Sequence, residues 1–183
     1  MISDPIEQFR RMTTAEQIKE GEDSLLAHIL EKALQAREKY PNIGMDAIDT
    51  FLADSDCLRY PARYAYEFGA DMAPHQFAQP EEDLRSNDPN ARVLYVRPLL
   101  RKRPDYAILA IAYMIPLVNY GDIVNDEHCL VYAASLLGLS EDECYLRLCE
   151  LADYCGSEVK YAEKSANTSN SCACSSGCGC GSS

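Results

Sequence analysis

The chain has 183 residues, enough for one domain of ordinary size. Its 29 Asp and Glu residues against 17 Lys and Arg give a formal net charge of −12, which excludes nucleic-acid binding over most of the surface. The N-terminal residues lack a signal-peptide pattern, and the longest apolar run, 106–118, is too short to cross a bilayer. We therefore expect a cytoplasmic protein that makes no membrane contact.

Helix signals dominate the N-terminal part of the chain. Asp4-Pro5 is typical of a helix start, and Thr13 and Glu16 have the spacing of a capping box. A stripe of apolar residues with the period of an α-helix follows Gly21. These patterns predict helices over residues 4–11, 22–39, 45–52 and 61–68.

The middle of the chain has weaker signals. Residues 69–91 contain three prolines and several Asn, Asp and Gln residues without any period, so we predict a long irregular loop. Val93–Val96 is rich in β-branched and aromatic residues, but Pro98 follows it closely. This short run is predicted to be an extended segment or the start of a helix.

The last third predicts three helices, over residues 106–119, 125–137 and 140–156. Asn125 and Ser140 are capping residues, and Gly138 and Gly156 are typical helix stops. Pro116 should kink the first of these helices or end it early.

Together these elements predict an all-α fold: a single bundle of about five to seven helices over residues 1–156, interrupted by the irregular loop 69–91. Residues 157–183 lack an apolar period, and residues 165–183 consist almost entirely of small and polar residues with Cys. We expect this C-terminal tail to be flexible and disordered.

Residues 106–155 resemble the TerB-like helical domain of the tellurite-resistance family. The likeness lies in the Gly121-Asp-Ile-Val turn, in Glu127 on the next helix, and in the Leu-Gly-Leu-Ser loop over 137–140. Tyr120 stands where that family has an Asp. The resemblance implies an all-α bundle and divalent-cation binding by acidic side chains. Of the positions in that family's turn and helix pattern, only Gly121 and Glu127 are carried over, and neither is assigned a role.

The tail contains four cysteines in a C-x-C-x3-C-x-C array, namely Cys172, Cys174, Cys178 and Cys180. Thiolates suit soft metal ions, and glycine and serine let the backbone bend around an ion, so we predict Zn²⁺ or Cu⁺ binding or a redox role. Cytoplasmic thiols stay reduced, which favours both uses over structural disulfides. Cys155, at the predicted end of the last helix, is a candidate extra ligand, whereas Cys149 fits the apolar stripe and is expected in the core.

Two alternatives remain for the tail. Its Ser, Cys and Gly residues resemble the cores of azole-type modified peptides, in which case the folded part is a leader that docks a modifying enzyme. The other alternative is a protein-interaction module whose tail is inert. No catalytic motif occurs in the chain, so an enzyme is not expected.

One basic cluster stands out in this acidic chain: Arg97, Arg101, Lys102 and Arg103. The cluster is predicted to bind a phosphate or an acidic partner segment. The alternative is that it neutralises the protein's own acidic helices.

Overall fold

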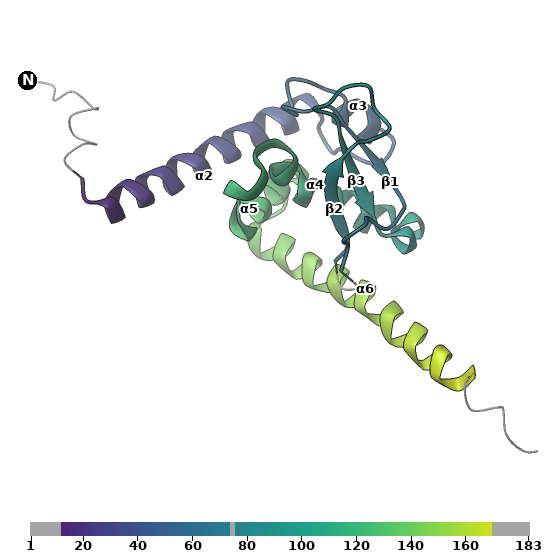
Figure 1. Cartoon of the computed structure of the whole chain (residues 1–183). Helices are drawn as coiled ribbons and strands as arrows, with labels where there is room; N and C mark the ends of the chain where they lie inside the picture. Colours follow the sequence, from purple (N-terminus) through teal and green to yellow (C-terminus); the bar gives the residue numbers. More distant parts are fainter. Residues whose placement is uncertain (1–11, 74–75, 170–183) are drawn as a thin grey trace, which may run out of the picture.

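The computed structural model of the chain describes residues 12–73 and 76–169 (Figure 1). The predicted helix over 4–11 lies outside the described residues. In chain order the described elements are α2 (Thr14–Lys39), α3 (Ile48–Leu52), β1 (Ala62–Ala65), β2 (Ala78–Glu82), β3 (Arg92–Val96), the 3-10 helix η1 (Pro98–Lys102), α4 (Pro104–Tyr120), the 3-10 helix η2 (Gly121–Ile123), α5 (Asp126–Leu137) and α6 (Glu141–Ser169).

The prediction of an all-α fold is wrong, because the middle of the chain forms a three-stranded sheet in the order β1-β3-β2. The central strand β3 runs parallel to β1 and antiparallel to β2. Leu94 of β3 lies opposite Tyr64 on one side and Pro80 on the other. The protein is therefore a mixed α/β domain in which helices pack on a small sheet.

Both outer strands replace predicted elements of another kind. The four-residue spacing of Tyr60, Tyr64 and Phe68 predicts a helix over 61–68, but the strand β1 forms there and pairs with β3. Strand β2 lies inside the predicted irregular loop. Its Pro80 is tolerated because β2 is an edge strand, where a residue without an N–H group costs no ladder hydrogen bond on the solvent side.

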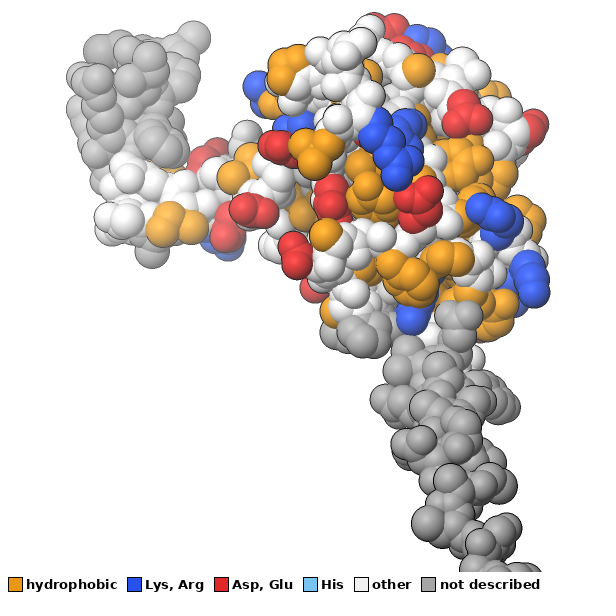
Figure 2. All heavy atoms as spheres, turned by 45° about the vertical axis from the view of Figure 1, so that its right-hand side comes forward, with side chains coloured by type: hydrophobic (Ala, Val, Ile, Leu, Met, Phe, Trp, Pro, Cys, Tyr) orange, Lys and Arg blue, Asp and Glu red, His pale blue; other side chains and the backbone are white. Residues whose placement is uncertain are grey.

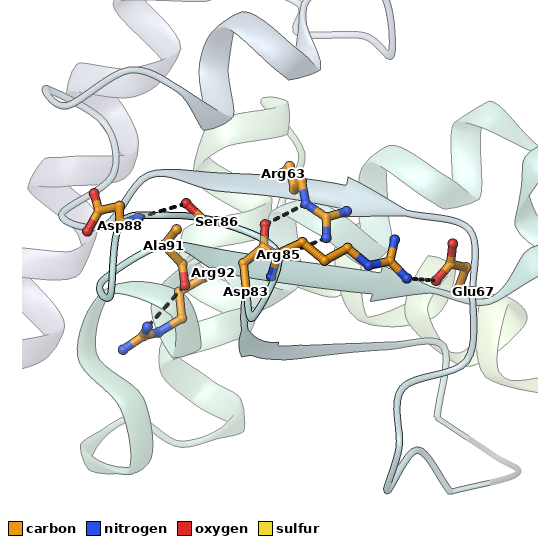
Figure 3. Close-up of polar contacts among 8 residues, drawn as sticks. All are labelled: Arg63, Glu67, Asp83, Arg85, Ser86, Asp88, Ala91 and Arg92. Atoms are coloured by element: carbon orange, nitrogen blue, oxygen red, sulfur yellow. Dashed lines mark hydrogen bonds and ion pairs between the residues drawn. The ribbon is translucent and has the colours of Figure 1, made fainter.

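An ion pair holds the connection between β2 and β3 against β1 (Figure 3). The guanidinium of Arg63 donates to both carboxylate oxygens of Asp83, at 2.8 Å for the Nη2–Oδ1 contact. The same carboxylate accepts the backbone N–H of Arg85, whose side chain reaches Glu67. Arg63 holds the pKa of Asp83 below its usual value. Polar contacts of this kind were not predicted, and they order part of the expected loop.

Helix α2 confirms the predicted helix over 22–39 and starts earlier than expected. The capping box is present: Thr13 Oγ1 accepts from the backbone of Glu16, and Glu16 accepts from the backbone of Thr13 at 2.7 Å. Ile29, Ala33 and Ala36 are buried, and α2 packs on α5. The first turns of α2 project beyond the body of the domain (Figure 1).

Helix α4 lies at the centre of the domain and packs against α5, β2 and β3. Its side chains are buried on nearly all sides, as its apolar sequence predicts. It continues past Pro116 to Tyr120, so the predicted helix over 106–119 is confirmed, and it does not end early at the proline. Among the described residues, 104–123 is the one stretch long and apolar enough to span a membrane, but 56% of its most apolar window is buried in the fold, as in a core helix.

The last two helices begin as predicted. Asn125 caps α5, and Gly138 ends it in the left-handed conformation with a φ of 70°. Ser140 Oγ accepts the backbone N–H of Glu143 at the start of α6. The predicted helix end at Gly156 is wrong, since α6 continues through that residue to Ser169 and projects away from the body (Figure 1).

Candidate functional site

The four tail cysteines, Cys172, Cys174, Cys178 and Cys180, lie outside the described residues. The structure does show the helix to which their segment is attached, α6. The last helical residue is Ser169, so Cys172 is the third residue after the end of α6.

Cys155 was predicted as an extra ligand for the tail site, and the structure places it elsewhere. Its side chain is fully buried in the core, and its backbone carbonyl accepts a hydrogen bond from Arg97. Cys155 precedes Ser169 by fourteen helical residues, or about 21 Å along the axis, whereas three extended residues reach about 10 Å. Cys155 and Cys172 therefore do not share one ion while α6 is helical. The later tail cysteines have enough chain to span this distance, but the Cys155 thiol is buried in the core, so the proposed site contains the four tail cysteines alone.

Three further cysteines of the body are also buried. Burial raises the pKa of the Cys57 thiol to about 11, that of Cys129 to about 12 and that of Cys144 to about 11. Thiols with these pKa values are protonated at neutral pH and react slowly. They act as small hydrophobic residues of the core.

Cys149 was expected in the core, but it is exposed. It lies along an open groove of about 610 Å³ between α4, α5, α6 and the segment before β2. The described lining of this groove is mainly apolar and includes Phe77, Met114 and Leu148. Residues from four separate parts of the chain form it, so no local sequence pattern predicts it.

The structure separates the side chains of the predicted basic cluster by their surroundings. Arg97 is buried and stacks over Phe68, whereas Arg101 lies over the ring of Tyr66 at 5.3 Å. Arg103 donates to both carboxylate oxygens of Asp105, at 3.0 and 2.7 Å, and covers Tyr106. Lys102 is exposed.

The surface view agrees with this separation. Figure 2 shows basic side chains scattered among hydrophobic and acidic ones on the face drawn, without one continuous basic patch. A phosphate site needs several donors that converge on one point. Arg97 is buried against Phe68, and Arg103 is paired with Asp105. These contacts favour the alternative prediction, in which the cluster neutralises the protein's own acidic helices.

The described residues also contain a polar junction that sequence reasoning missed. Asp54, after α3, accepts from Lys39 at 2.7 Å and from the hydroxyl of Tyr40 at 2.7 Å. The Lys39 ammonium and the Tyr40 hydroxyl hold the pKa of Asp54 well below its usual range. Asp56 also pairs with Lys39. This junction ties the end of α2 to α3 and has the character of a structural contact.

Within residues 12–73 and 76–169, no three His, Cys, Asp or Glu side chains are grouped so that they could hold a metal ion. The predicted metal site therefore depends on the tail cysteines. Acidic side chains near Glu127, the position matched to the TerB-like domain, form no such group among the described residues either.

Compared with protein-family models, curated proteins and solved structures, the chain has no match. The resemblance of residues 106–155 to the TerB-like domain thus stays a prediction.

Proposed function

We propose that this protein is a non-enzymatic carrier of a soft metal ion, Zn²⁺ or Cu⁺, which binds to the tail thiolates of Cys172, Cys174, Cys178 and Cys180. The ion would supply no catalytic step; binding releases protons from the thiols and brings the four sulfurs together. A cytoplasmic location is part of the proposal, since reduced thiols are needed.

The observation that carries this proposal is the contrast between the two groups of cysteines. Four of the five described cysteines are buried, and burial raises the pKa of Cys57, Cys129 and Cys144. The four tail cysteines stand within nine residues, among Ser, Ala and Gly, where the sequence offers no apolar partner for packing. Reactivity is the remaining reason to place cysteine there.

The position of the tail also supports a carrier role. Helix α6 projects from the body (Figure 1), and the four tail cysteines follow its last residue, Ser169, in the sequence. An ion bound there is accessible to a second protein that receives it.

A competition titration tests the proposal on the full chain, with a reductant present and with a chromophoric chelator for Zn²⁺ or Cu⁺. We expect one ion per chain. The variant in which all four tail cysteines are replaced by Ser should bind at least about 1,000-fold more weakly. Cys149→Ser is the matched control, because Cys149 is an exposed cysteine of the body. Equal binding by the tail variant and the unmodified chain would refute the carrier function.

A second function, that of a precursor whose tail is modified by an enzyme, is favoured by the same projection of α6, which gives a large partner access to the tail. Cyclodehydration of Cys or Ser side chains removes one water molecule per ring. The intact mass of the chain isolated from its native host decides the question. A deficit of one water per ring supports modification, and the encoded mass excludes it. Failure of both tests would leave a protein-interaction module with an inert tail.

A further inference from the structure

Helix α2 has an apolar face beside the one that packs on α5. Ile29, Ala33 and Ala36 are buried. Leu26, Leu30 and Leu34 follow one another at four-residue steps. Leu26 is half-buried, while Leu30 and Leu34 are 39% and 49% exposed. Neighbouring exposed leucines on one helix are typical of a contact surface.

Opposite charges flank these leucines. Asp23 precedes Leu30 by seven residues, and Arg37 follows it by seven. Seven residues are almost two helical turns, so both charged residues lie on the same side of the helix as Leu30. Both are exposed, and neither has an ion pair with another residue in the described part of the chain. The guanidinium of Arg37 lies beside Gly138 at the end of α5, without a charged partner among the described residues. We call the set Asp23, Leu26, Leu30, Leu34 and Arg37 the leucine face.

The leucine face is complementary to itself when two copies of α2 run antiparallel. A two-fold axis at Leu30 places Leu26 of one copy beside Leu34 of the other. The same axis places Asp23 beside Arg37 of the second copy at both ends of the contact. A parallel arrangement would instead place like charges together. Self-complementarity around a two-fold axis is the requirement for a symmetric dimer.

We propose that two copies of this chain associate through the leucine face, with their α2 helices antiparallel. The pairing would also give the first turns of α2, which project from the body, a protein surface to pack against. In the dimer these turns lie along the second copy. The proposal does not depend on the metal-binding function, since it uses no residue of the tail.

Sedimentation equilibrium of the full chain tests the proposal, from about 1 μM to about 1 mM. A reductant is present so that tail cysteines do not crosslink copies. We expect a monomer–dimer equilibrium. The double variant Leu30→Glu with Leu34→Glu should raise the dissociation constant at least about 100-fold. Leu84→Glu is the matched control, because Leu84 is 91% exposed on the β2–β3 connection, and it should leave the constant unchanged.

A monomer at all concentrations overturns the proposal, and so does a dimer that the double variant leaves intact, which would indicate another interface. Circular dichroism of the double variant checks that it is folded; both leucines are substantially exposed, so loss of the fold is not expected.

Charge exchange tests the antiparallel arrangement without changing a leucine. Asp23→Arg alone and Arg37→Asp alone each create two like-charge contacts, and each should weaken the dimer about five- to tenfold at low salt. The variant with both exchanges restores both opposite-charge contacts and should recover the original dissociation constant. A double exchange that associates no better than the single ones contradicts the antiparallel pairing.

Discussion

The folded body and the C-terminal tail use the same residue type in opposite ways. Cys57, Cys129, Cys144 and Cys155 of the body are buried in the core, whereas the four tail cysteines stand among Ser, Ala and Gly. Surroundings, and not residue identity, decide whether a thiol is a packing group or a reactive one. The sequence around the tail cysteines offers no apolar partner, so reactivity is the expected reason for cysteine at these positions.

The largest expected effect concerns thiol reactivity. In the folded protein at neutral pH, an alkylating reagent should modify the tail cysteines and Cys149 at least about 1,000-fold faster than the buried cysteines, which react only after local or global opening. Time-resolved labelling followed by peptide mass spectrometry measures each rate. Rapid labelling of Cys129 or Cys144 would contradict the assignment of these residues to the core.

Within α6, the contrast between a buried and an exposed cysteine should also appear in the free energy of unfolding. Cys144 is fully buried and Cys149 is exposed, although both belong to one helix. Cys144→Ser places a hydroxyl in the core and should lower the free energy of unfolding by about 1–3 kcal/mol. Cys149→Ser should change it by less than about 0.5 kcal/mol. Urea denaturation gives both values, and equal effects would show that Cys144 is not a core residue.

Substitutions at two glycines should have opposite effects on stability, one in the body and one where α6 leaves it. Gly138 has a φ of 70°, and a Cβ there would lie 2.7 Å from Nη2 of Arg37. Gly138→Ala should therefore cost about 1–2 kcal/mol. Gly156 lies in a helix with open space around it, so Gly156→Ala should increase helix stability by about 0.5–1 kcal/mol. Circular dichroism and denaturant unfolding test both, and a destabilising Gly156→Ala would argue against a helix through this residue.

The smallest effect is a pH dependence at Asp54, next to the buried Cys57. Lys39 and Tyr40 lower the pKa of Asp54 in the folded protein. A carboxyl group with a lowered pKa stabilises the fold above its unfolded pKa, about 3.9, and loses this contribution as the pH falls. The stability difference between the unmodified protein and Asp54→Asn should therefore shrink as the pH falls below about 4. Unfolding curves at a series of pH values measure it, and a constant difference would contradict the assignment.

The helices were predictable where their signals are local. Thr13 with Glu16, Asn125 and Gly138 each act within a few residues, and the structure has each of them in the predicted role. Gly156 carries the same local signal as Gly138, yet α6 passes through it. One glycine costs a helix only about 1 kcal/mol, so neighbouring turns decide whether the helix ends there.

The sheet could not be predicted in this way because its pairing is not local. Strand β1 pairs with β3 thirty positions away, as in the contact of Tyr64 with Leu94. Pro80 argues against a strand unless the strand is known to be at an edge, and only the tertiary structure supplies that fact. The surroundings of the basic cluster could not be predicted for the same reason: adjacency in sequence does not show that Arg97 is buried and that Arg103 is paired with Asp105.

The central claim is that the tail thiolates, and not the body, hold a soft metal ion. X-ray absorption at the zinc edge of the Zn²⁺-loaded full chain tests it most directly, because the spectrum reports the ligand atoms themselves. The proposal predicts four sulfur ligands at about 2.3 Å. A shell of nitrogen and oxygen ligands at about 2.0–2.1 Å would place the ion elsewhere and contradict the claim.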